Sequence, residues 1–189
     1  MKGVIKGELE IEGNLILTGD LTVEKWINAT GYIDCAGYFI KAGDFIKAGS
    51  YIKAGYFIEA GSYIKAGDFI EAGDSIKAGY FIKAGDFIEA GDSIKAGYSI
   101  EAGDFIKAGD SILAQLWVKA KTTISAGIYI YAGLVTWRKR EVEDMVIECK
   151  KLLSGEVAFG TLKEIEKVIE EMTVEQICKA LGKNVKIIK

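Results

Sequence analysis

The sequence predicts a mainly β fold: a single-stranded triangular parallel β-helix, or solenoid, with a small α+β module at its carboxyl end. Three observations predict it. A six-residue repeat runs through residues 37–133, each repeat carries an isoleucine and an alanine at fixed places, and a glycine stands between successive repeats. A period of six would spiral the isoleucines around a helix, and the recurrent glycine would weaken that helix, so a β structure is favoured.

The alternation of side chains along a strand assigns the inside and the outside of each repeat. Residues two apart on a strand point to the same side, so Ile40 and Ala42 share one side and Lys41 lies on the other. A column of charged side chains is unstable in a dry core. The isoleucine and alanine positions therefore form the predicted core, the Lys/Glu positions face solvent, and glycine occupies a corner where a Cβ would clash.

A single repeat buries too little surface to be stable, so successive coils must stack at about 4.8 Å per layer. Three repeats per coil give the simplest closure, a triangle. A looser form of the pattern, with Gly7, Gly13 and Gly19, indicates that the solenoid begins near the amino terminus. Ile33 and Ile40 are seven residues apart, so an insertion near Ala36 predicts a bulge or a change of corner.

Stacking every third repeat sorts the outward residues onto three faces. Face 1 carries an aromatic ladder and a charged column: Tyr51, Phe69, Phe87 and Phe105 beside Lys53, Glu71, Glu89 and Lys107. Face 2 carries Phe45, Tyr63, Phe81 and Ser99 beside Lys47, Lys65, Lys83 and Glu101. Face 3 starts with Phe39 and Phe57 and continues with Ser75, Ser93 and Ser111, with Asp74, Asp92 and Asp110 at its corner.

Two interpretations of the ladders remain open. Either the rings simply stack between coils and stiffen the prism, or they form an apolar stripe for self-association or for a partner. The second gives the predicted site, whose partner or oligomer face is Tyr51, Phe69, Phe87, Phe105, Glu71 and Glu89. A second face consists of Phe45, Tyr63, Phe81, Lys47, Lys65 and Lys83. The serine-rich face 3 is the expected solvated face.

The charged columns also have two interpretations. Mixed signs on neighbouring coils are typical of a solvated surface with weak ion pairs. The run Lys47, Lys65 and Lys83, flanked by aromatic residues, superficially suits a nucleic-acid strand. A net charge of −3 and repeats without arginine argue against nucleic acid as a partner.

The repeat stops after Gly133, which divides the chain into a solenoid at residues 1–137 and a cap or module at 138–189. Trp137 is expected to cover the last coil. Residues 145–153 and 156–159 then form a hairpin around Ser154-Gly155, although the first of these segments also fits a helix. Capping boxes that start at Thr161 and Thr173 predict two short helices, followed by a terminal strand at 185–188. Residues 172–182 resemble the opening of a helix-turn-helix without its recognition helix, so a packing or docking module is favoured.

The segment Ile40-Lys-Ala-Gly43 and its repeats resemble the left-handed β-helix family, with the large and small positions exchanged. The stretch from Gly7 to Val23 resembles a bactofilin, a polymer-forming cytoskeletal protein with a right-handed triangular β-helix. The two resemblances imply opposite hands, and both stay open. The whole arrangement is similar to uncharacterised solenoid proteins of bacteria and their phages.

The absence of histidine bears on chemistry, because the enzymes of the left-handed family, chiefly acyltransferases and carbonic anhydrases, rely on it. We therefore expect no enzyme, no cofactor and no metal site. Cys35, Cys149 and Cys178 lack a ligand-like spacing. Without a signal peptide or a long apolar run, the expected location is the cytoplasm, or the host cytoplasm if a phage encodes the chain, with no membrane partner.

The leading hypothesis for function is a structural or interaction protein whose rigid solenoid forms a homo-oligomer, a dimer or trimer, or binds a protein partner. One alternative is a phage-borne inhibitor of a host defence enzyme or a nucleic-acid-binding enzyme that acts by surface mimicry. The acidic column Asp68, Asp86 and Asp104 motivates it. Another alternative is a filament-forming cytoskeletal protein, although the predicted carboxyl-terminal cap opposes unlimited stacking.

Overall fold

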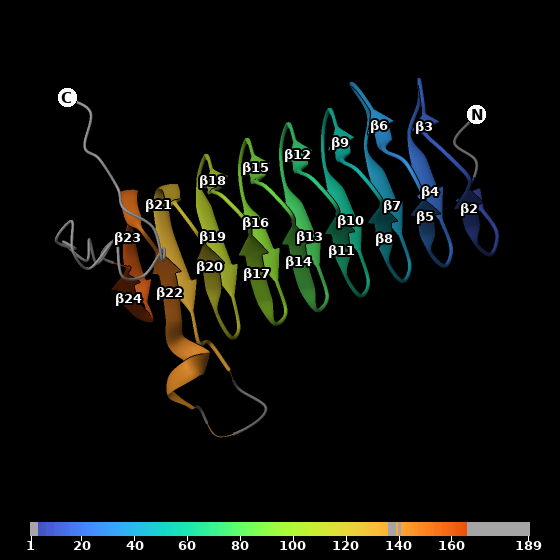
Figure 1. Ribbon diagram of the computed structural model, residues 1–189. Coiled ribbons are helices and arrows are strands. Elements are labelled where there is room, and N and C mark those ends of the chain that lie inside the picture. The colour runs from blue at the N-terminus through green and yellow to red at the C-terminus, as the bar shows by residue number, and fades with distance from the viewer. Residues whose placement is uncertain (1–3, 136–138, 140, 166–189) are drawn as a thin grey trace, which may run out of the picture.

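The computed structural model describes residues 4–135, 139 and 141–165 of the chain. These residues form a parallel β-solenoid in which short strands stack along one axis, with the amino-terminal coil at one end (Figure 1). The prediction of a mainly β, parallel solenoid is confirmed. The one helical element among the described residues is a 3-10 turn, η1 (Val142–Met145).

Each coil contributes one strand to each of three faces. Face 1 consists of β3 (Leu15–Ile16), β6 (Ile33–Cys35), β9 (Ile52–Ala54), β12 (Ile70–Ala72), β15 (Ile88–Ala90) and β18 (Ile106–Ala108). Face 2 consists of β2 (Leu9–Ile11), β5 (Ile27–Ala29), β8 (Ile46–Ala48), β11 (Ile64–Ala66), β14 (Phe81–Ala84), β17 (Ser99–Ala102), β20 (Val118–Ala120), β22 (Val146–Cys149) and β24 (Thr161–Glu164). Face 3 consists of β1 (Val4–Ile5), β4 (Leu21–Val23), β7 (Ile40–Ala42), β10 (Ile58–Ala60), β13 (Ile76–Ala78), β16 (Ile94–Ala96) and β19 (Ser111–Ala114).

Two longer strands, β21 (Thr123–Ala132) and β23 (Lys151–Phe159), pass round the corner between faces 1 and 3. The amino-terminal part of β21 pairs with β18, and its carboxyl-terminal part pairs with β19. Faces 1 and 3 therefore join into one 15-stranded sheet, and face 2 forms a 9-stranded sheet of its own within the described residues.

The register places each residue on its counterpart in the next coil. Ile58 pairs with Ile76, and Lys65 pairs with Lys83, in parallel register. The side-chain ion pairs between regular coils join residues 18 apart, such as Lys41 and Glu59. This spacing confirms the predicted closure of three repeats per coil.

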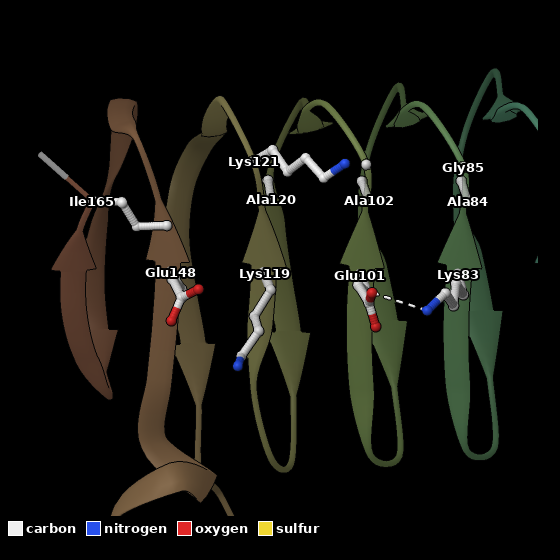
Figure 2. Close-up of a pocket in the computed structure, with 11 residues that line it drawn as sticks. Lys83, Ala84, Gly85, Glu101, Ala102, Lys119, Ala120, Lys121, Glu148 and Ile165 are labelled. Carbon is white, nitrogen blue, oxygen red and sulfur yellow. Dashed lines mark hydrogen bonds and ion pairs between the residues drawn. The ribbon is translucent and has the colours of Figure 1, made fainter. Parts of the chain in front are cut away.

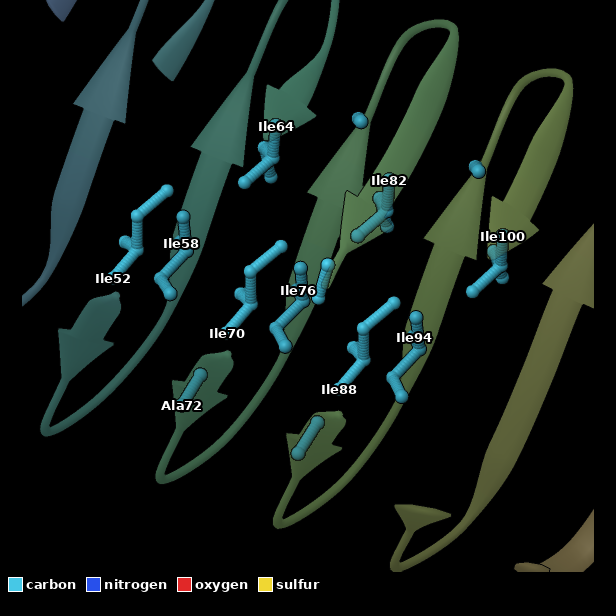
Figure 3. Packing of buried hydrophobic residues seen from close by; sticks show 14 of the residues in the cluster. Ile52, Ile58, Ile64, Ile70, Ala72, Ile76, Ile82, Ile88, Ile94 and Ile100 are labelled. Atoms are coloured by element: carbon cyan, nitrogen blue, oxygen red, sulfur yellow. The ribbon is translucent and has the colours of Figure 1, made fainter. Parts of the chain in front are cut away.

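The core is a stack of isoleucine and alanine (Figure 3). Ile40, Ile76 and Ile112 have no exposed surface, and Ala42 is 2% exposed. Fully burying an isoleucine side chain contributes about 1.5–3 kcal/mol, so the continuous stack supplies most of the stabilisation. The side chains between them, such as Lys41, point outward as predicted.

Close stacking explains the glycine at the corner more fully than a tight turn does. A Cβ on Gly85 would overlap the carbonyl oxygen of Gly67 in the preceding coil, and the same relation holds between Gly103 and Gly85. Neither Gly85 nor Gly103 has a positive φ. Glycine is therefore required there by the approach of two backbones rather than by the conformation of one.

The predicted insertion is present at Ala36. Before it, Leu15 pairs with Ile33; after it, Ile33 pairs with Ile52, one residue further along than the regular spacing. Gly37 absorbs the extra residue with a φ of 80°. The amide of Tyr38 donates to the carbonyl of Cys35 at 3.0 Å. The turn keeps the core positions aligned across the insertion.

At the carboxyl end, the predicted hairpin is wrong. The strand β22 pairs in parallel with β20 and β24. The strand β23 pairs in parallel with β21 and follows it round the corner at Ser154-Gly155 without reversing direction. The hydroxyl of Ser154 donates to the carbonyl of Ala126 at 2.8 Å. Pairing with the open coil satisfies the backbone groups of β20 and β21, and Ile147 and Cys149 extend the core with no exposed surface.

The solenoid thus continues past the predicted boundary at residue 137, because parallel pairing extends to Glu164. The predicted helix start at Thr161 is wrong over residues 161–164, which form β24. The carboxylate of Glu164 instead accepts a hydrogen bond from the amide of Leu152 at 3.0 Å. Trp137, the remainder of the two predicted helices, the segment that resembles a helix-turn-helix and the terminal strand lie outside the described residues.

Candidate interaction faces

The aromatic ladder of face 1 is present as predicted. The rings of Tyr51, Phe69, Phe87 and Phe105 stack with centroids 4.8 Å apart and interplanar angles of 2°. Each ring is half-buried by its neighbours. Because the strand spacing sets the ring spacing, the ladder follows directly from the stacking of the coils, and each well-placed pair contributes about 0.5–1.5 kcal/mol.

The ladder extends one ring further than the sequence prediction. Tyr32 stacks on Tyr51 at 4.6 Å, with an interplanar angle of 4°. Tyr32 was missed because it lies before the insertion at Ala36, so it is not at the regular spacing from Tyr51. Applying the one-residue shift to the whole first segment would have found it.

The second ladder lies on face 2. Trp26, Phe45, Tyr63 and Phe81 stack successively at 5.4, 4.8 and 4.9 Å. On face 3, Phe39 and Phe57 stack at 4.6 Å, and the equivalent positions above them are the serines Ser75 and Ser93. The three faces therefore differ in aromatic character, as the sequence indicated.

Among the described residues, the most exposed aromatic side chains lie at the corners, and they were not singled out from the sequence. Tyr56 is 52% exposed, and Tyr80 is 48% exposed. Tyr80 and Tyr98 follow one another on the corner between faces 3 and 2, with ring centroids 5.1 Å apart. Their place in the repeat, directly after the glycine, is the signal that identifies them.

The charged column of face 1 is paired within the molecule. Lys53 contacts Glu71 at 2.9 Å, and Lys107 contacts Glu89 at 2.8 Å. The hydrogen bond from each lysine to its glutamate raises the pKa of Lys53 and of Lys107. Glu71 and Glu89 occupy adjacent coils, so each glutamate is neutralised from the side away from the other.

Below this column, Asp34 adds a further negative charge. Its Oδ1 is buried and has no hydrogen-bond partner among the described residues. Burial, followed by the nearby Asp34 carboxylate, raises the pKa of Tyr51. At the lower end of face 1, Lys53 therefore lies in register between two carboxylates, Asp34 and Glu71.

On the other two faces, the charged side chains are paired less evenly. On face 3, Glu59 lies between Lys41 and Lys77 at 3.1 and 3.4 Å, and its hydrogen bond with Lys41 lowers the pKa of Glu59. On face 2, Lys83 contacts Glu101 at 2.9 Å. Lys47 and Lys65 have no carboxylate partner among the described residues. These exposed pairs contribute roughly 0–1 kcal/mol each.

A shallow depression of about 340 Å³ lies on face 2 near its carboxyl-terminal end (Figure 2). Its polar lining consists of Lys83, Glu101, Lys119, Lys121 and Glu148. Lys83 is paired with Glu101, and the Lys119 Nζ lies 5.8 Å from the centre of the Trp117 ring. The lining holds no hydroxyl or thiol that could act as a nucleophile, so we assign it no reaction.

The two described cysteines take the alanine place of the repeat and are buried. Burial, followed by Asp20 and Asp34, raises the pKa of Cys35 to about 11. Burial and Glu164 raise the pKa of Cys149. Both thiols are protonated near neutral pH and pack as small apolar groups. Cys178 lies outside the described residues.

Within the described part of the chain, no three His, Cys, Asp or Glu side chains are placed to hold a metal ion together. A helix of sufficient length and apolar character to cross a bilayer is likewise not found there.

Comparison with protein families, with curated proteins and with solved structures finds no match to this chain.

Proposed function

We propose that the protein is a non-catalytic structural or interaction protein whose rigid solenoid assembles with copies of itself, or binds a protein partner, through face 1. The observation that carries the proposal is the continuous stripe of five stacked rings from Tyr32 to Phe105. Contiguous apolar stripes of this kind mark association surfaces. The core supports it too, because a stack of buried isoleucines holds the stripe flat and rigid.

The test replaces Phe69, Phe87 and Phe105 with serine and measures the mass by light scattering. Serine stands at the equivalent place on face 3, in Ser75, Ser93 and Ser111, so the coil accommodates it. We expect the mass to fall toward that of the 20.5 kDa monomer, because the central apolar contact is lost.

The matched control replaces Phe39 and Phe57 on face 3 with serine. It removes a stacked aromatic pair of the same geometry from a different face, and we expect the assembly to keep its mass. A triple variant of face 1 that retains the wild-type mass would contradict the proposal.

A filament is the second candidate. The stretch from Gly7 to Val23 resembles a bactofilin, and the strands β1, β2 and β3 each have a neighbour on one side only within the described residues. Ile5, which occupies a core position of this first coil in register with the buried Val23, is 39% exposed. An unpaired strand edge with exposed apolar side chains favours end-to-end contact.

Electron microscopy of the concentrated protein distinguishes the two assemblies. End-to-end contact predicts fibres that lengthen with concentration and that disappear in a variant with Ile5→Lys, which places a charge at the open end of the core. Lateral contact through face 1 predicts assemblies that tolerate this change, because Ile5 belongs to β1 on face 3 and occupies an inward position. Fibres that persist in the Ile5→Lys variant would contradict end-to-end contact.

A further inference from the structure

The fold separates charge across the prism. In the two central coils, residues 62–97, every lysine lies on face 2 or face 3, and every carboxylate lies on face 1 or on one of its two corners. The lysines are Lys65, Lys77, Lys83 and Lys95. The carboxylates are Asp68, Glu71, Asp74, Asp86, Glu89 and Asp92. In these two coils face 1 is thus the acidic side of the prism, with the aromatic ladder at its centre.

The acidic side is only partly neutralised within one molecule. Glu71 and Glu89 pair with lysines of the outer coils. The corner aspartates are exposed, and Asp86 and Asp92 have no lysine partner among the described residues. A second molecule that met this face with its own face 1 would bring carboxylates against carboxylates, which opposes that contact.

Face 2 carries an excess of positive charge. Lys47, Lys65 and Lys83 stack directly on one another in register. Like charges in directly opposite positions are destabilising. The lower two lysines have no carboxylate partner among the described residues. A partner with carboxylates at the spacing of the coils would relieve this repulsion.

From this separation we propose that face 1 of one molecule binds face 2 of a second copy of the chain. The inference rests on the proposed function and names the partner surface. Both ladders repeat at the same distance, 4.8 Å between Tyr51 and Phe69 and 4.8 Å between Phe45 and Tyr63. Carboxylates on one face and lysines on the other therefore stay in register along the whole contact. A partner with a different repeat length would lose this register.

Face 3 fits less well as the partner surface. Its aromatic stacking stops at Phe57, and Lys41 and Lys77 already share an ion-pair partner, Glu59. Face 2 offers an aromatic ladder from Trp26 to Phe81 beside unpaired lysines. Because the two joined surfaces differ, each molecule uses both, and assembly continues to a closed ring of more than two copies or to an open array.

Two charge-reversal variants test the inference. The first carries Lys47→Glu, Lys65→Glu and Lys83→Glu, which makes face 2 acidic. The second carries Glu71→Lys, Asp86→Lys and Glu89→Lys, which makes face 1 basic. The second variant stacks lysine at positions 53, 71, 89 and 107, one more than the three lysines that wild-type face 2 stacks in the same geometry. Circular dichroism checks that each variant is folded.

We expect each variant alone to sediment as a 20.5 kDa monomer, because both of its faces carry the same sign. An equimolar mixture of the two should regain the wild-type mass, because opposite faces meet again across the two chains. The matched control, Lys77→Glu with Lys95→Glu on face 3, should keep the wild-type mass.

The outcomes separate the two proposals. A wild-type protein that is monomeric contradicts the homo-oligomer and this inference together. A wild-type oligomer that both variants preserve, or variants that dissociate but do not recombine in the mixture, overturns the pairing of face 1 with face 2 and leaves the proposed function standing.

Discussion

Replacing Gly85 with alanine should destabilise the solenoid by about 3 kcal/mol or more. The new Cβ would overlap the carbonyl oxygen of Gly67, which belongs to the backbone of the preceding coil and cannot rotate away. The coils must separate locally, which also disturbs the isoleucine stack beneath them. Urea denaturation followed by circular dichroism measures the loss as a lower free energy of unfolding.

Gly19→Ala is the matched control. A Cβ at Gly19 meets no atom within 4 Å, and its φ is not positive. The same chemical change should therefore alter the free energy of unfolding by no more than about 0.5 kcal/mol. Equal losses at the two positions would show that close stacking is not the reason for glycine at the corner.

The second large effect is expected for Ile76→Ala. Ile76 has no exposed surface and stacks between Ile58 below and Ile94 above. Truncation leaves a cavity with neighbouring coils on both sides, and such changes cost about 2–5 kcal/mol. The same urea titration measures it, and crystals of the variant would show the vacated volume.

Leu9→Ala gives the comparison within the same core. Leu9 is only partly buried and pairs with Ile27 on one side, at the end of its sheet among the described residues. Because less surface is lost and the site is open, we expect a cost below about 2 kcal/mol. A cost at Leu9 that equals the cost at Ile76 would contradict the picture of a stack whose stability comes from both neighbours.

The regular coils could be predicted from the sequence because one physical requirement recurs in every repeat. The isoleucine of each hexad, such as Ile40, faces inward since a charged neighbour such as Lys41 cannot. The register then follows, because a shift of one residue would place lysines in the core. The ladder from Tyr51 to Phe105 could be listed in advance for the same reason.

The carboxyl-terminal strands could not be predicted in the same way. The turn residues Ser154-Gly155 are typical of a hairpin, and the pair Thr161 and Glu164 is typical of a helix start. Both local preferences are overridden by parallel pairing with β20 and β21, because the backbone groups of that last open coil need hydrogen-bond partners. No short-range pattern in the sequence indicates that these backbone groups require partners.

The sequence by itself determined the solenoid, its core, its corners and the membership of the outer columns, because each depends on a short repeat that is visible along the chain. Only the tertiary structure decided which residues at the carboxyl end extend the stack and how far each ladder runs past the insertion at Ala36. It also decided that the aspartates of two separate corners border the same face as Glu71 and Glu89. The physical reason is the closure of each coil. Residues six apart in the chain become neighbours across a face or a corner only when the three strands of a coil close into a triangle. The aromatic stripe first identified from its spacing thereby lies at the centre of a surface that is acidic in the two central coils.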